Sequence, residues 1–142
     1  MSHTKRRLSR NSKATITKQA KIVLTFIEML NTVKLYHWKT HSFATHKATD
    51  ELYADLNSNI DKFVETMLGH SASDPINNRV NLSHVKSIPL CDYNSANDYI
   101  KRIKQYIAFL NGLSLAHLTD LMTVRDELLI NMNKFLYLMT FT

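Results

Sequence analysis

Apolar residues recur at helical spacing in four segments of the chain, and the clearest of these lies near the middle. It runs from Phe43 to Leu68 without a glycine or proline and stops at Gly69. At about 100° per residue, the apolar residues of this segment share one face: Leu52, Leu56, Ile60, Phe63 and Met67. The pattern predicts one long helix that buries this face.

The preceding segment predicts a first helix that begins near Thr15. Its apolar stripe continues to His37 and consists of Ile16, Ala20, Val23, Ile27 and Leu30. Residues 39–42 break the pattern, which indicates a tight turn into the next helix. His37 is therefore expected to point inward or along the seam between helices, where a lone histidine is by default a hydrogen-bonded core residue.

Two further helices are predicted after residue 94. Ser95 is a candidate N-cap for the third helix, which continues past Gly112 to about His117. Its inner stripe is Tyr99, Ile103, Tyr106, Ile107 and Leu110. In the fourth helix, Thr123 with Asp126 and Glu127 has the spacing of a capping box. The apolar positions that follow are Val124, Leu128, Met132, Phe135, Leu136 and Met139.

The polar segment 70–94 separates the second and third helices and holds both prolines. It is far longer than an antiparallel helix turn needs, and long enough to run back along a helix of about 40 Å. This favours a crossover that leaves the second and third helices parallel. A short helical turn is expected around residues 82–86.

Composition agrees with an all-α domain. Hydrophobic residues make up 44% of the 142 residues, enough for a core, whereas 2 glycines and 2 prolines are too few for the turns of an all-β fold. No apolar run approaches the roughly 18 residues of a membrane span. The single cysteine, Cys91, excludes an internal disulfide and fits a reducing compartment, so an intracellular protein without a membrane partner is expected.

The net charge of +6 is concentrated at the N-terminus. The first 21 residues contain no acid and seven basic residues, while the remainder is nearly neutral. We expect residues 1–14 to form a mobile basic arm, residues 15–142 to form the helical domain, and the arm to bind DNA phosphates without sequence preference. The predicted DNA contacts are Lys5, Arg6, Arg7, Arg10, Lys13, Lys18 and Lys21. A solubilising tail and an organelle transit peptide are the alternatives.

A stripe of metal-ligating residue types lies beside the apolar face of the second helix. His46, Asp50, Asp61 and Glu65 fall within about 100° of one another around the helix. His46 and Asp61 are roughly 22 Å apart along the axis, so they cannot bind one ion within a single helix. The alternative interpretation is an ordinary solvated polar face.

An antiparallel copy of the same helix would bring these residues together. A two-fold contact centred between Asp55 and Leu56 places His46 opposite Glu65 of the partner subunit, and Asp50 opposite Asp61 of the partner subunit. Facing carboxylates repel unless a cation lies between them, and mixed imidazole and carboxylate ligands suit iron, manganese or zinc. The stripe thus predicts two equivalent metal sites at a dimer interface.

Four helices, a long connection, a basic arm and this stripe together resemble the Dps-like miniferritins of the ferritin-like superfamily. The similarity covers residues 15–140 and is carried by His37-Trp38, His46, Asp50-Glu51-Leu52-Tyr53, Asp61, Glu65, Leu68-Gly69 and the segment Lys134 to Met139. As in that family, fifteen residues separate His46 from Asp61 and four separate Asp61 from Glu65. The resemblance implies a ferritin-like four-helix bundle with one long crossover between its second and third helices.

The resemblance also implies a function. His37 and His46 of one subunit would face Asp61 and Glu65 of the partner subunit, Asp50 would be an auxiliary ligand, and Trp38 would pack beside the site. Iron would be bound there, oxidised by oxygen or peroxide, and stored inside a cage of identical subunits. The segment between the two histidines is three residues shorter than the family's pattern. His41 could therefore replace His37 as a ligand, or His37 could support the site without binding the metal.

Two other functions are weighed against the ferroxidase. One is an architectural DNA-packaging protein that keeps the scaffold without iron turnover, which the shortened turn favours. The other is a helical adaptor without a ligand. The short, Lys- and Asn-rich chain is also similar to small Dps-like proteins of large DNA viruses, which adds the virion to the cytoplasm or nucleoid as an expected location.

Overall fold

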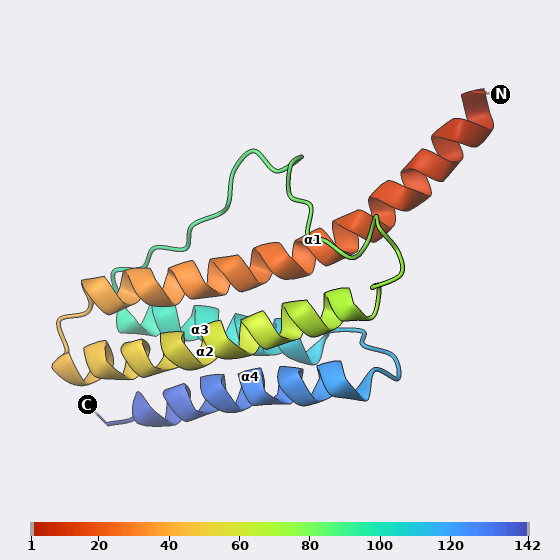
Figure 1. Cartoon of the computed structure of the whole chain (residues 1–142). Helices are drawn as coiled ribbons and strands as arrows, with labels where there is room; N and C mark the ends of the chain where they lie inside the picture. Colours follow the sequence, from red (N-terminus) through yellow and green to blue (C-terminus); the bar gives the residue numbers. More distant parts are fainter. Residues whose placement is uncertain (1, 142) are drawn as a thin grey trace.

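A computed structural model describes residues 2–141, with side chains from residue 18 onward. It contains α1 (Ser2–Lys39), α2 (Phe43–Gly69), α3 (Ala96–Asn111) and α4 (Thr119–Leu138). These helices pack side by side as a four-helix bundle, and no strand occurs between residues 2 and 141 (Figure 1). The predicted all-α class is confirmed.

The bundle consists of two layers of two helices. In one layer, the Tyr36 ring of α1 stacks on the Tyr99 ring of α3, with centroids 4.2 Å apart. In the other layer, ion pairs join α2 to α4: Lys62 lies 3.0 Å from Glu127, and Lys134 lies 2.7 Å from Glu51. Between the layers the core is closely packed, with side chains that have no exposed surface: Phe26, Met29, Val33, Leu56, Phe63, Ile103, Leu110, Leu128 and Met132.

The predicted apolar faces of α2 and α3 lie in this core, whereas the stripe predicted for α1 lies only partly there. The buried stripe of α1 is Ile22, Phe26, Met29, Val33 and Tyr36. Ala20 and Val23 of the predicted stripe are buried too, but Ile27 and Leu30 are only partly buried and pack against the core from its edge. The sequence therefore contains two adjacent apolar stripes on α1, and the prediction identified the one beside α2.

α1 begins at Ser2, so the predicted start near Thr15 is wrong. The apolar spacing starts only at about residue 15, but the backbone is already helical from Ser2. Residues 2–39 contain no glycine or proline that would break the helix. Residues 2–14 of the predicted arm fall in this part of α1. The arm's side chains lie outside the described residues, so neither its mobility nor its DNA contacts are tested.

The link between α3 and α4 also differs from the prediction. α3 ends at Asn111, with Gly112 as its C-cap, and does not reach His117. Ala116 has a φ of 52°, in the left-handed region that interrupts a right-handed helix. The ending at Gly112 leaves residues 112–118 as a short loop that Leu115 anchors in the core.

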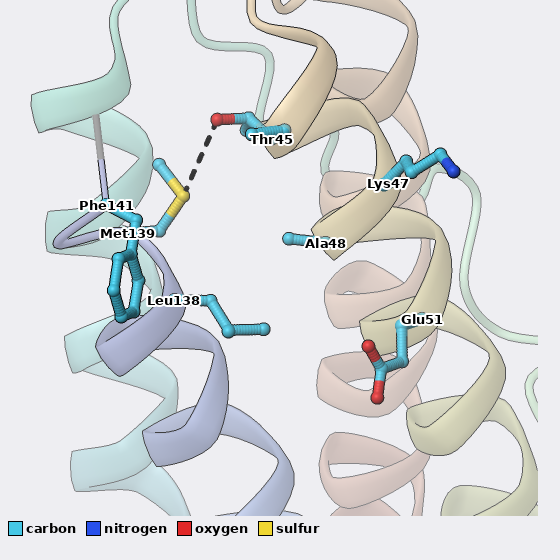
Figure 2. A pocket seen from close by; sticks show the side chains of 8 residues that line it. Thr45, Lys47, Ala48, Glu51, Leu138, Met139 and Phe141 are labelled. Atoms are coloured by element: carbon cyan, nitrogen blue, oxygen red, sulfur yellow. Dashed lines mark hydrogen bonds between the residues drawn. The ribbon is translucent and has the colours of Figure 1, made fainter.

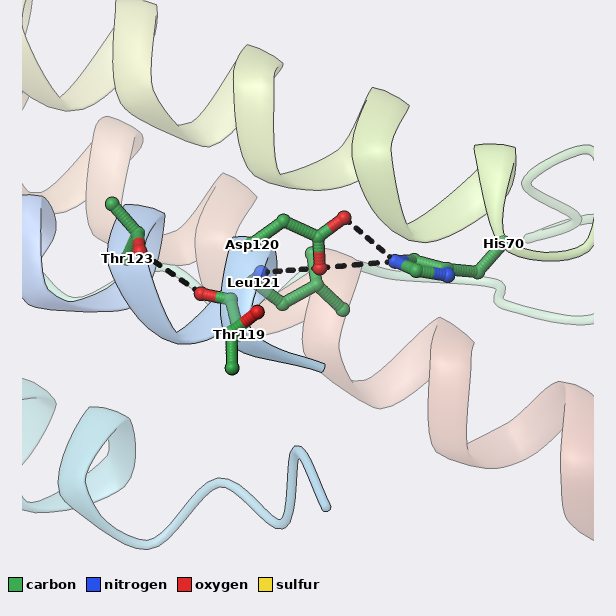
Figure 3. Close-up of polar contacts among 5 residues, drawn as sticks. All are labelled: His70, Thr119, Asp120, Leu121 and Thr123. Atoms are coloured by element: carbon green, nitrogen blue, oxygen red, sulfur yellow. Dashed lines mark hydrogen bonds and ion pairs between the residues drawn. The ribbon is translucent and has the colours of Figure 1, made fainter. Parts of the chain in front are cut away.

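α4 begins at Thr119, so Thr123 is not its cap. The Thr123 hydroxyl donates to the Thr119 carbonyl one turn earlier, which is a contact within the helix (Figure 3). The start of α4 is held instead by Asp120, whose carboxylate accepts from the Leu121 backbone N–H at 2.8 Å. The same carboxylate lies 2.8 Å from His70 Nε2, which fixes the end of α2 against the start of α4.

The connection between α2 and α3, residues 70–95, runs along α1 (Figure 1). Ile76 and Val80 line a small cavity together with Ala20 and Val23 of α1. Further along, the Cys91 thiol donates to Glu28 at 3.1 Å, and Asp92 pairs with Lys39 at 3.1 Å. The short helical turn expected around residues 82–86 is a single hydrogen-bonded turn, in which the Val85 amide donates to the Leu82 carbonyl. Within the described range, no helix is both long and apolar enough to cross a membrane.

Candidate metal-binding site

His37 lies in the last turn of α1, and its imidazole is buried, with 9% of the residue exposed. Nδ1 is 2.8 Å from the carbonyl oxygen of His46 and 3.0 Å from the Thr49 hydroxyl. A carbonyl oxygen can only accept a hydrogen bond, so Nδ1 carries the proton. The hydroxyl of Thr49 donates to the Thr45 carbonyl at 2.8 Å and thus accepts from the imidazole.

His46, in the first turns of α2, makes the reciprocal contact. Its Nδ1 is 2.8 Å from the carbonyl oxygen of His37, and the two imidazoles stack with centroids 3.8 Å apart and planes 16° apart. Both rings are therefore held with Nδ1 protonated. In a neutral ring, this leaves Nε2 as the nitrogen with a free lone pair.

The tight turn between α1 and α2 creates this arrangement. The Ser42 hydroxyl caps α2 by accepting from the Thr45 amide at 3.2 Å, and the Ser42 amide donates to the Thr40 hydroxyl at 3.1 Å. The tight turn predicted for residues 39–42 is confirmed and occupies residues 40–42, since Lys39 still belongs to α1. Because it is so short, the last turn of α1 lies directly against the first turns of α2. The three-residue shortening therefore does not separate His37 from His46.

The predicted carboxylate ligands lie elsewhere on α2. Asp50, Asp61 and Glu65 are exposed and, among residues 18–141, form no ion pair. Nor do the described side chains bring three or more His, Cys, Asp or Glu residues together at metal-binding distances. Within one chain the structure thus joins the two histidines to each other but not to the acids. Their pairing with a partner's acids stays a prediction.

An apolar groove lies between α1 and α2, and of these acids Asp61 lines it. Its floor and walls are Val23, Phe26, Ile27, Ile60 and Val64, and Asp61 and Asn57 also line it. It includes Val23 and Ile27 of the predicted α1 stripe. The seam between α1 and α2 therefore carries apolar and acidic groups together on an open surface.

Trp38 and His41 lie at the α1–α2 turn and are exposed. Trp38 has 68% of its surface exposed, and the Lys34 ammonium lies 5.5 Å from its ring centroid and 4.6 Å from that of Tyr53. His41 lies within the turn. The imidazole that stacks on His46 is that of His37.

Residues 37–139 of this sequence match a protein family described as a family of unknown function, DUF5856. The chain belongs to the DUF5856 family. The matched segment begins at His37 and contains every predicted metal ligand, while the basic arm and most of α1 lie before it. No curated protein matches the chain, and no solved structure does so either.

Thr49 of this DUF5856 protein contacts the candidate site and is not among the residues predicted from the sequence. It has no exposed surface, and its hydroxyl bonds the Nδ1 of His37. The available signal was its spacing: Thr49 follows His46 by three residues, so it lies on the same side of the helix.

A second cavity lies on the opposite side of α2, between its first turns and the end of α4 (Figure 2). There the Thr45 hydroxyl donates to the Met139 sulfur at 3.7 Å. Ala48, Leu138 and Phe141 form much of the lining, and only Lys47 and Glu51 are charged. Without an imidazole or a second carboxylate, this cavity does not have the donors of a metal site.

Proposed function

We propose that the chain is a Dps-like miniferritin: a homo-oligomer that binds Fe(II) between two-fold related subunits, oxidises it with oxygen or peroxide, stores the product inside a shell, and binds DNA through its basic N-terminus. The single observation that carries the iron-binding part is the His37–His46 pair. Both Nδ1 atoms are tied to backbone carbonyls, and in a neutral ring this leaves both Nε2 atoms as acceptors. Metal-ligating histidines typically have this outer hydrogen bond, because it fixes the tautomer and the ring orientation.

The state of the acids supports a site completed by a second subunit. Asp50, Asp61 and Glu65 have no cationic partner among the described residues, although α2 and α4 pair other acids with lysines. An antiparallel two-fold contact along α2 would set these carboxylates against the histidines of the other copy. The donor set would then be imidazole and carboxylate, which suits iron and also accepts manganese or zinc.

The groove between α1 and α2 supports the same contact. Ile27, Leu30 and Val64 are apolar residues that the bundle buries only in part. A second copy lying across the seam would cover them and would bring Asp61 into the interface. The long path of residues 70–95 beside α1 supports the ferritin-like crossover in the same proposal.

The experiment is anaerobic Fe(II) titration of the purified protein, followed by air or peroxide, with the appearance of Fe(III) recorded by absorbance. His46→Ala and Asp61→Ala should each abolish most of the oxidation. The matched controls His84→Ala and Asp98→Ala remove the same groups from exposed positions outside α2, and they should leave it intact. Equal activity in all four variants would refute the site.

The second candidate function is a DNA-packaging protein on the same scaffold without iron turnover. The separation of the acids from the histidines within one chain favours it, because such a chain alone holds only half of a site. Its distinguishing result is wild-type protein that binds duplex DNA but neither binds nor oxidises Fe(II). Solution mass and metal content of the purified protein separate the two functions further, and a monomer without a DNA shift would indicate an adaptor.

The proposed location is the cytoplasm or nucleoid, with the virion as alternative.

A further inference from the structure

The two layers of the bundle carry opposite charge. From residue 18 onward, α1 has four basic residues and one acid, and α3 has three basic residues and one acid, a net charge of +5. In the other layer, α2 has two basic residues against five acids, and α4 has two against three, a net charge of −4. The nearly neutral body expected from the sequence is therefore strongly polarised.

The cations of the α1–α3 layer and of its covering connection are available to a partner. Six of them are exposed and form no ion pair within residues 18–141: Lys18, Lys21, Arg79, Lys86, Lys101 and Lys104. In the α2–α4 layer, by contrast, Lys62 and Lys134 are paired with acids of the neighbouring helix. The polarised layer thus presents unneutralised positive charge over its length.

The spacing of these cations matches a long anion. Lys21 lies near the start of the described part of α1, while Lys101 follows Tyr99, which stacks on Tyr36 near the other end of that helix. Lys21 and Tyr36 are fifteen residues apart on α1, which is roughly 22 Å along the helix axis. Duplex DNA presents about one negative charge per 1.7 Å of axis, so this stretch faces many phosphates.

The chemistry of the layer favours duplex DNA over other anions. Binding to a membrane surface needs large apolar side chains beside the cations. Beside Lys101 and Lys104, α3 exposes none, whereas the connection exposes Ile76, Val80, Ile88 and Leu90. The inference therefore rests on the cations of α3, and the test includes a lipid surface. Single strands need aromatic platforms; Trp38, at the end of α1, is the one exposed aromatic residue in this layer from residue 18 onward. Residues 2–17 continue α1 with five more basic residues and no acid.

We infer that duplex DNA lies along the folded α1–α3 layer, with Lys101 and Lys104 of α3 contacting its phosphates, in addition to the N-terminal contacts.

This inference rests on the proposed DNA binding, and the test separates the two. Fluorescence anisotropy with a 30-bp duplex of mixed sequence, at several salt concentrations, would compare full-length wild type with three variants. The first is Lys101→Gln with Lys104→Gln. The second, Lys47→Gln with Lys62→Gln, removes the same charge from α2. The third, Lys5→Gln with Arg6→Gln and Arg7→Gln, weakens the N-terminal contacts.

The α3 variant should bind roughly tenfold more weakly at 0.1 M salt, with a salt slope reduced by about 2, while the α2 variant should match the wild type. An unchanged affinity and slope in the α3 variant, with loss in the N-terminal variant, would overturn the inference and leave the proposed function standing. Equal losses in the α3 and α2 variants would also overturn it, since only net charge would then matter. Wild type that binds anionic phosphatidylserine vesicles but not the duplex would overturn both.

Discussion

The imidazole of His37 lies flat on that of His46, and each ring donates a hydrogen bond from Nδ1 to the other residue's backbone carbonyl. The contact joins the end of α1 to the start of α2 across a turn of three residues. It fixes the orientation of both rings without using Nε2. The bundle therefore holds the two histidines in position before any metal or partner arrives, which lowers the cost of ordering a site.

Thr49→Val should weaken metal binding without unfolding the protein. The hydroxyl of Thr49 is a second acceptor for His37 Nδ1, and losing an outer-shell partner of a ligating histidine typically lowers metal affinity about tenfold to a hundredfold. Because the His46 carbonyl remains as an acceptor, we expect the lower end of that range. Thr45→Val is the matched control, since this buried threonine bonds Met139 and neither histidine. Anaerobic titration with Fe(II) measures both, and equal affinities would show that Thr49 only packs.

Two buried tyrosines of α3 should respond oppositely to loss of the hydroxyl. The Tyr106 hydroxyl donates to Glu28 at 2.8 Å and contacts the Thr32 hydroxyl at 2.9 Å, so Tyr106→Phe should cost about 1.5–3 kcal/mol of unfolding free energy. The Tyr99 hydroxyl is buried and has no hydrogen-bond partner among the described residues. Tyr99→Phe should therefore stabilise the fold by about 1 kcal/mol. Urea unfolding followed by circular dichroism measures both, and destabilisation by Tyr99→Phe would reveal a partner for that hydroxyl.

The same tyrosines predict a loss of stability in alkali. Burial raises the pKa of Tyr99 and of Tyr106 well above the ordinary value. In the unfolded chain both ionise near pH 10. Their contribution to stability is therefore complete below about pH 10 and is lost as the pH rises from there toward the folded-state pKa. The melting temperature should fall steeply above pH 10, and less steeply in the Tyr99→Phe/Tyr106→Phe double variant. Full tyrosinate absorbance at 295 nm before any loss of helical signal would contradict this.

The periodicity predicted α2, and the start and inner face of α3, because both helices have one apolar face with clear caps, Ser42 and Ser95. It placed the end of α3 too late, since the helix stops at Asn111. It misjudged α1, where two adjacent apolar stripes compete and only packing against α3 decides which is central. It misplaced the start of α4, because Thr123 with Asp126 and Glu127 has capping-box spacing inside a helix whose start Asp120 holds. The spacing of residues along the sequence does not predict such contacts.

For the site, the sequence indicated which residues carry ligand chemistry but not which of them meet. The reciprocal bonds between His37 and His46 depend on main-chain carbonyls, and no residue type at positions 37 or 46 encodes them. Thr49 was missed for the same reason: its role depends on the turn that brings α1 over it.

Mixing two inactive variants should restore activity if the site is shared between subunits. Asp61→Ala and His46→Ala each remove one ligand from both sites of a dimer. In a mixed dimer, one site keeps His46 of one chain and Asp61 of the other, whereas the second site loses both. After random reassembly half of the dimers are mixed, so about a quarter of the wild-type Fe(II) oxidation should return. The control mixes Asp61→Ala with the Asp61→Ala/His46→Ala double variant, in which no site regains Asp61. Mixed dimers verified by mass that show no recovery would mean that the acids and the histidines do not act at one ion, because the fifteen residues between them are too many for any contact within a single helix.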